Sequence, residues 1–124
     1  MKKKAETEVE IKEKEPKSVF LEYFGSSPYI KVLDFLLQGQ DFDYSMTEIA
    51  RGAGVGWSAF KKIWQQLMDK RIILPSRKIG NAKLFRLNKD NEAVKKLIKL
   101  DWELTKLETH KFLEQEEKAI KISA

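Results

Sequence analysis

The sequence predicts a mainly α-helical protein with one small β-hairpin, followed by a long C-terminal helix. Three segments within residues 27–70 place apolar residues at helical spacing. The period changes to two over residues 83–87, after the turn signal Gly80-Asn81. The stretch Asn91–Lys118 contains neither glycine nor proline, which favours one continuous helix. These patterns divide the 124 residues into a charged flexible N-terminal tail (1–17), a globular domain (18–90) and a C-terminal helix (91–124).

The first 17 residues, MKKKAETEVEIKEKEPK, are a low-complexity mixture of Lys and Glu. Val9 and Ile11 are the sizeable apolar side chains in this segment, and they bury too little surface to offset the entropy of ordering. We therefore predict a mobile tail or a frayed helix that ends before Pro16. A short helical segment, Val19–Phe24, follows it and ends at Gly25.

Two helices of the domain are predicted from their capping residues. The first begins at Ser27-Pro28, where serine caps the helix and proline is tolerated at the first position, and it ends at Gly39. The second begins at the capping box Ser45-Met46-Thr47-Glu48 and ends at Gly54. The buried stripe of the first helix is predicted to comprise Ile30, Leu33, Leu36 and Leu37, and that of the second Ile49, Ala50 and Ala53.

A third amphipathic helix is predicted over residues 57–70, before the hairpin. Its inward positions are Phe60, Ile63, Trp64, Leu67 and Met68. The short β-type run Ile72-Ile73-Leu74 is then expected to break at Pro75, and residues 83–87 alternate polar and apolar side chains. We predict two antiparallel strands joined by a basic loop, Arg77–Lys83.

The charges are unevenly distributed along the chain. The net charge is +5, but residues 61–90 hold nine Lys or Arg against two Asp, a net of +7. Residues 18–60 carry −3, and residues 91–124 are neutral. A single block with more than the whole net charge is typical of a surface that meets a polyanion, although most charge runs are simply solvated faces.

Composition excludes several other functions. The chain has no cysteine and one histidine, His110, so we expect no disulfide, no metal site and no cofactor. The glycines of Gly52-Ala53-Gly54-Val55-Gly56 lack the Lys-Ser/Thr of a phosphate-binding loop, and the carboxylates lie on predicted turns and solvent faces. We therefore expect a soluble, cytoplasmic protein that is not an enzyme, with no membrane partner.

Residues 46–63 resemble a helix-turn-helix, residue by residue. The matching positions are Ile49, Ala50, Ala53, Gly54, Val55, Phe60 and Ile63. Ala50 lets the second helix cross closely, and Gly54 permits the left-handed turn between the helices. With the basic hairpin that follows, the region of about residues 27–90 is similar to small archaeal winged-helix transcriptional regulators of the MarR/ArsR-like kind. This resemblance implies a dimeric regulator that binds a two-fold double-stranded DNA site.

The pattern departs from the family at two positions of the second helix. Gly56 stands where serine or threonine often caps this helix, and Trp57 stands where arginine or a polar residue is common. We expect the helix over 57–70 to enter the major groove and the wing over 75–86 to contact the backbone or minor groove. Trp57 either contacts DNA or packs beside the hairpin. The candidate DNA-binding residues are Thr47, Trp57, Ser58, Lys61, Lys62, Gln65, Arg77, Lys78, Asn81 and Lys83.

The C-terminal helix is predicted to mediate homodimerisation. Leu97, Leu100, Leu104 and Leu107 have the three-four-three spacing of a short coiled-coil seam. The alternative is that this helix covers Val19–Phe24 within the same chain. A second function also stays open, in which the winged helix is a protein–protein interaction module within a transcription or other nucleic-acid assembly. Neither the operator, nor the sense of regulation, nor any small-molecule effector follows from the sequence.

Overall fold

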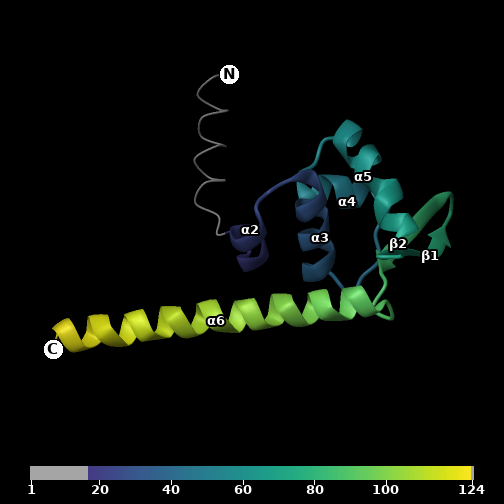
Figure 1. Ribbon diagram of the computed structural model, residues 1–124. Helices are drawn as coiled ribbons and strands as arrows, with labels where there is room; N and C mark the ends of the chain where they lie inside the picture. Colours follow the sequence, from purple (N-terminus) through teal and green to yellow (C-terminus); the bar gives the residue numbers. More distant parts are fainter. Residues whose placement is uncertain (1–16, 124) are drawn as a thin grey trace, which may run out of the picture.

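The computed structural model describes residues 17–123, so nearly all of the predicted tail (1–17) lies outside the described residues. The elements follow the predicted order (Figure 1). They are α2 (Val19–Phe24), α3 (Pro28–Gln38), α4 (Met46–Ala53), α5 (Trp57–Asp69), β1 (Ile73–Ile79), β2 (Ala82–Leu87) and α6 (Glu92–Ser123). The mainly helical fold, with one antiparallel hairpin and a long C-terminal helix, is confirmed, and it is consistent with a winged helix followed by a C-terminal helix. Within the described part, no helix is both long and apolar enough to cross a membrane.

The helix boundaries follow from the caps that the sequence provides. The side chain of Ser27 accepts a hydrogen bond from the Ile30 N–H, and Pro28 occupies the first turn of α3. Ser45 and Glu48 form the predicted capping box at the start of α4, with distances of 3.2 and 3.0 Å. Gly54 ends α4 in the left-handed conformation, with φ 69° and ψ 37°.

Close packing between α3 and α4 depends on a glycine that the sequence pattern did not single out. A Cβ atom at Gly52 would lie 2.7 Å from Cζ of Phe35, whose ring packs on Tyr44 at 4.8 Å between centroids. Gly52 therefore sets how closely α4 approaches α3. Ala50, which was predicted to lie at the crossing of α4 and α5, is buried.

The hairpin differs from the prediction in two respects. First, β1 does not break at Pro75; it continues to Ile79, with an irregularity in register between Pro75 and Lys78. Proline is tolerated because β1 pairs with a strand on one side only. It is therefore an edge strand, and a residue without an N–H can be accommodated there. Second, the predicted basic loop is mostly strand, and the turn proper is Gly80-Asn81.

The regular alternation predicted over residues 83–87 is also incomplete. Leu84 and Phe85 are adjacent in sequence and both buried. The backbone of Phe85 bridges to Tyr44 in both directions, at 2.8 and 2.7 Å, and its ring meets Trp64 edge-on. Contacts from the α3–α4 loop and from α5 therefore cover this part of β2 on more than one side.

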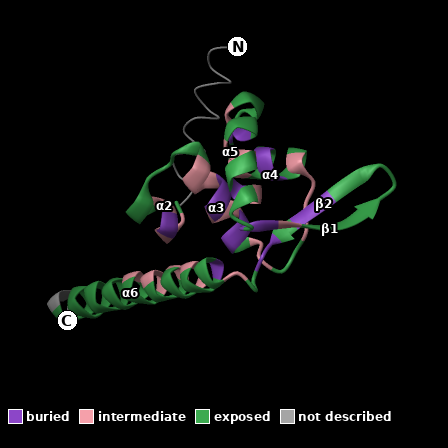
Figure 2. Cartoon of the chain, turned by 45° about the vertical axis from the view of Figure 1, so that its right-hand side comes forward, coloured by how far each residue is buried: buried purple, intermediate pink, exposed green. Residues whose placement is uncertain are grey.

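The core draws on every element of the domain. Its largest fully buried side chains are Phe20, Phe60, Leu36, Leu37, Ile49, Leu67, Ile73, Leu87, Val32 and Val94. Val32 is an addition to the predicted stripe of α3, whereas Ile30 is half-buried and packs against the core's edge. The beginning of α6 contributes Val94 to the core, and most of the remaining helix is exposed (Figure 2).

Two asparagines attach α6 to the turn between α5 and β1. The Asn88 side chain donates to the carbonyl oxygen of Arg71 at 2.8 Å, and the Asn91 side chain donates to those of Lys70 and Arg71 at 3.0 and 3.1 Å. The Asn91 carboxamide oxygen also accepts from the Ala93 N–H at 2.8 Å, which caps α6. Because Arg71 adopts a positive φ of 56°, both asparagines hold a tight turn in place. They fix where α6 leaves the domain.

Candidate nucleic-acid interface

The exposed face of α5 carries the predicted contact residues. Phe60 and Leu67 are fully buried, which turns the opposite side of the helix to solvent. The exposed side chains are Trp57, Ser58, Lys61, Lys62 and Gln65, as the helical spacing predicted. No ion pair within residues 17–121 involves Lys61 or Lys62, so their charges are uncompensated at short range. The Gln65 amide is already engaged, because it donates to Asp69 at 2.8 Å.

Trp57 both packs and remains exposed. Its ring stacks on that of Phe60, with centroids 5.5 Å apart and an angle of 18° between the planes. The residue is nevertheless 48% exposed. Gly56 caps α5 without a side-chain hydrogen bond, so the packing of Trp57 on Phe60 anchors the first turn. A fixed, half-exposed aromatic ring therefore stands at the end of α5 where a helix would enter a groove.

The first helix of the motif exposes the predicted Thr47 and one further polar side chain, Arg51. Thr47 lies in the first turn of α4 and Arg51 in its last, four residues apart and both exposed. Among the described residues, Arg51 forms no ion pair within 4 Å. Both side chains are therefore accessible to a ligand beside α4.

Arg77 is held by an acid of the same chain. Asp43 accepts hydrogen bonds from Nε and Nη2 of Arg77, at 2.8 and 3.2 Å, and from Oγ of Ser76, at 2.8 Å. The Arg77 guanidinium, with help from Ser76, lowers the pKa of the Asp43 carboxyl, and the carboxylate in turn raises the pKa of Arg77. The charge of Arg77 is thus matched by Asp43 within the hairpin.

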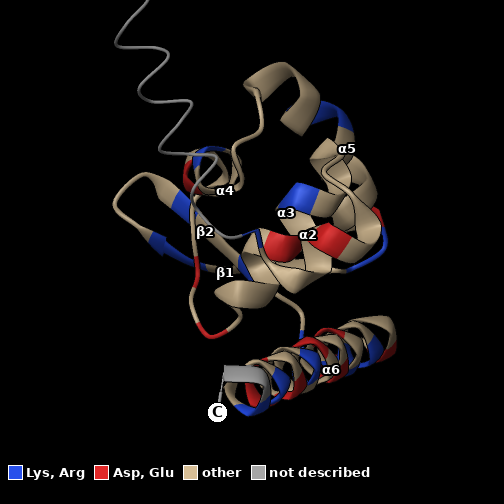
Figure 3. Cartoon of the chain, turned by 90° about the vertical axis from the view of Figure 1, so that its left-hand side faces the viewer, with Lys and Arg blue, Asp and Glu red and all other residues tan. Residues whose placement is uncertain are grey.

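Nearer the turn, the hairpin lysines are not matched. Lys78 and Lys83 are direct partners across the two strands, and Asn81 lies in the turn; all three are exposed. Neither lysine takes part in an ion pair among the described side chains. Figure 3 shows the Lys and Arg segments on the hairpin, in contrast to α6, where acidic and basic residues are mixed. The outer hairpin is therefore a cationic surface.

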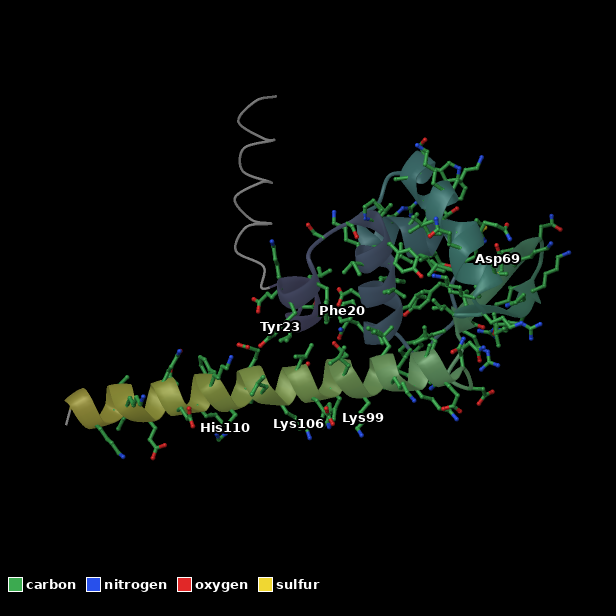
Figure 4. The ribbon with its side chains drawn as sticks, in the orientation of Figure 1. Phe20, Tyr23, Asp69, Lys99, Lys106 and His110 are labelled. Atoms are coloured by element: carbon green, nitrogen blue, oxygen red, sulfur yellow. The ribbon has the colours of Figure 1, made fainter. Side chains whose placement is uncertain are left out.

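The predicted seam residues of α6 have different surroundings. Leu97 packs against the domain's own core, and Leu104 is half-buried. Leu100 and Leu107 are 39% and 46% exposed. Helix α2 lies along α6, and the Tyr23 hydroxyl donates to Glu108 at 2.6 Å (Figure 4). Helix α6 thus contacts Val19–Phe24 of the same chain, the alternative that the sequence left open.

Sequence reasoning missed the residues that position this surface. Asp43 lies in a polar turn with no pattern to distinguish it, and its partners are 33 and 34 residues away. Asn88 and Asn91 lie just before α6. An asparagine directly before a predicted helix is a capping signal, so the capping role of Asn91 could have been found from the sequence. Their second role, holding the α5–β1 turn, depends on tertiary contacts and has no local signal.

Comparisons with known proteins give one structural likeness. No family model matches the chain, and no curated protein matches it. Among solved structures, it is similar to Sso10a-2, a DNA-binding protein from Sulfolobus solfataricus, at 17% sequence identity and a TM-score of 0.45. The match covers 72% of this chain and 90% of that one.

Proposed function

We propose that this protein is a sequence-specific, double-stranded DNA-binding transcriptional regulator. One observation carries the proposal: four lysines without ion pairs, Lys61, Lys62, Lys78 and Lys83, are exposed on α5 and on the hairpin beside it. Gln65 of α5 lines the same groove as the two hairpin lysines, which supports a shared binding surface. A cationic helix beside a cationic hairpin fits a duplex better than it fits a neutral ligand.

In this proposal α5, over about residues 57–70, enters the major groove, which accommodates one helix. Lys61 and Lys62 reach guanine edges or phosphates, and Ser58 reaches a base or the backbone. Gln65 pairs with adenine after it exchanges its hydrogen bond with Asp69. Trp57 contacts a thymine methyl group or a sugar with its exposed edge.

The hairpin, over residues 75–86, lies along the backbone or enters the minor groove in the same proposal. Lys78, Lys83 and Asn81 are its contact residues, and Arg77 ties the hairpin to the α3–α4 loop through Asp43. Thr47 and Arg51 on α4 reach flanking phosphates. Backbone contacts of this kind fix orientation, whereas base edges in the major groove provide sequence preference.

The test is duplex binding across salt concentrations by the wild type and two double variants. Lys61→Ala/Lys62→Ala should relax sequence preference, and Lys78→Ala/Lys83→Ala should weaken binding to all sequences alike. Lys96→Ala/Lys99→Ala, which removes two exposed α6 lysines outside the surface, is the matched control. Binding that neither double variant changes would refute the groove assignment.

We also propose that α6 mediates a homodimer, as a two-fold DNA site requires. Support comes from apolar side chains that the domain leaves exposed on this helix: Leu100, Trp102, Leu107, Phe112 and Leu113. Leu100→Glu/Leu107→Glu should lower the mass measured by light scattering, while Lys99→Ala/Lys106→Ala should not. A mass of one chain for the wild type would remove the dimer from the proposal without affecting DNA binding by one domain.

A protein–protein interaction module is the second candidate. The observation that favours it is the half-exposed, anchored ring of Trp57, a residue type that often dominates binding at protein interfaces. An apolar anchor predicts binding that depends weakly on salt and that nonspecific DNA does not compete away. DNA binding by this chain should instead weaken steeply with salt.

A further inference from the structure

A groove of about 500 Å³ lies between α5 and the hairpin, and its apolar walls take no part in the proposed duplex contacts. Its apolar walls are formed by Trp64 and Met68 of α5 and by Pro75, Leu84 and Phe85 of the hairpin. This volume falls within the range of about 300–1,000 Å³ found for small-ligand sites. The groove therefore has room for one flat ring system.

The rim of this groove carries an unrelieved repulsion. Lys78 and Lys83 both line it and are directly opposed in the register of β1 and β2. Like charges in a cross-strand pair are destabilising, and no carboxylate among the described residues pairs with either lysine. Arg77 also lines the groove, but Asp43 already holds it. One anionic group between the two lysines would remove the repulsion.

The walls favour an aromatic body for the ligand that carries this anion. Trp64 meets Phe85 edge-on, with ring centroids 4.9 Å apart, and packs on Phe60 at 5.2 Å. Every nucleobase has a π-face that stacks on aromatic side chains with little dependence on sequence. A flat ring joined to a phosphate matches both the apolar walls and the paired lysines.

We propose that the groove binds one unpaired nucleotide of a DNA strand, with its base against Trp64, Met68 and Leu84 and its phosphate between Lys78 and Lys83. The inference rests on the proposed function, because a strand bound by α5 and the hairpin passes the junction between them. A nucleotide that is already unpaired requires no unstacking from a duplex, so the groove favours bulged sites over matched ones.

The experiment compares two duplexes of one sequence, matched and with a single bulged 2-aminopurine nucleotide. Stacking of one base on aromatic side chains corresponds to roughly a 5- to 150-fold gain, or about 1–3 kcal/mol. We expect the wild type to bind the bulged duplex tighter by a factor in this range. The 2-aminopurine fluorescence should fall on binding as the base stacks in the groove.

Variants test whether the tighter binding of the bulged duplex depends on the groove. Lys78→Gln/Lys83→Gln and, separately, Met68→Ala should bring the ratio of the two affinities towards one. The matched control Lys61→Gln/Lys62→Gln should weaken binding to both duplexes and leave their ratio unchanged. Thermal unfolding establishes that each variant is folded, and Met68 is suitable because it is half-buried rather than fully buried.

Each outcome separates this inference from the proposed function. Equal wild-type affinity for the two duplexes, with steep salt dependence, overturns the unpaired-nucleotide site and leaves duplex binding intact. A preference for the bulge that Lys78→Gln/Lys83→Gln and Met68→Ala both retain also overturns it. Competition by free AMP without any gain from the bulge would show a small-molecule site in place of the proposed one. Binding to neither duplex overturns both proposals.

Discussion

The ion pair between Asp43 and Arg77 makes the two adjacent hairpin cations unequal, although the sequence presents them as a pair. Asp43 lies 2.8 Å from Nε of Arg77, whereas Lys78 has no acidic partner among the described residues. An uncompensated cation that neutralises a phosphate releases counterions. Each such contact makes the slope of log K for DNA binding against log[salt] more negative by about 0.9. Removing Lys78 should therefore flatten this slope more than removing Arg77.

The magnitude follows from the cations that the structure leaves without partners. If Lys61, Lys62, Lys78 and Lys83 each neutralise one phosphate, the slope is roughly −3.6 for one subunit and near −7 for a dimer. Lys78→Gln should flatten the dimer's slope by about 1.8, and Arg77→Gln by less than half of that. Asp43→Asn frees Arg77 and should steepen the slope by up to about 1.8.

The assay is fluorescence anisotropy of a labelled duplex over a roughly tenfold range of KCl concentration. Arg77→Gln in the Asp43→Asn background is the control, because freeing Arg77 can have no effect on the slope when Arg77 is absent. Equal flattening by Lys78→Gln and Arg77→Gln would refute the reasoning. It would mean that Asp43 does not occupy Arg77 when the protein binds DNA.

Three other predictions concern stability. Gly52→Ala should lower the free energy of unfolding by about 1–2 kcal/mol in urea denaturation, because the clash with Phe35 outweighs the gain in helix propensity. Asn91→Ala should cost about 1–2 kcal/mol through the lost α6 cap, and Asn91→Asp, which keeps the capping oxygen, should recover part of it. Burial, together with the nearby Asp34 carboxylate, raises the pKa of Asp101. The ionised form of Asp101 therefore opposes folding. The stability gained by Asp101→Asn should be greatest near pH 7 and should shrink as pH falls through the raised pKa of Asp101. A difference in Tm between variant and wild type that does not change with pH would contradict this.

The parts of the fold that the sequence predicted well depend on local chemistry. Ser27 and Ser45 cap helices through atoms three residues away, and Gly54 is needed at its own backbone conformation. These interactions are complete within one turn, so short-range patterns contain them. The exposed face of α5 was predictable for a similar reason, because helical periodicity alone separates Phe60 and Leu67 from Lys61 and Lys62.

The sequence predictions were wrong or incomplete where contacts with residues distant in the sequence determine the structure. Pro75 ends a strand in isolation but is accommodated in an edge strand, and only the pairing shows that β1 is one. Gly52 carries no special backbone requirement and is small because Phe35 approaches it from another helix. The spacing of Leu97 and Leu107 on α6 likewise indicates an apolar seam without indicating whether α2 or a second chain faces it.

The α3–α4 loop explains why the acidic block of residues 18–60 does not cancel the basic block of residues 61–90. Tyr44 ties this loop to Phe85 of β2 through two backbone hydrogen bonds, which places the loop's acids beside the hairpin. Asp43 then pairs with Arg77, and Asp41 with Lys89 at 2.7 Å. The two acids are occupied by Arg77 and Lys89, so Lys78 and Lys83, which lie nearer the turn, have no acidic partner among the described residues. The charge available to a polyanion is therefore set by where the loop is anchored, since the same residue counts with acids placed near the turn would leave the hairpin neutral.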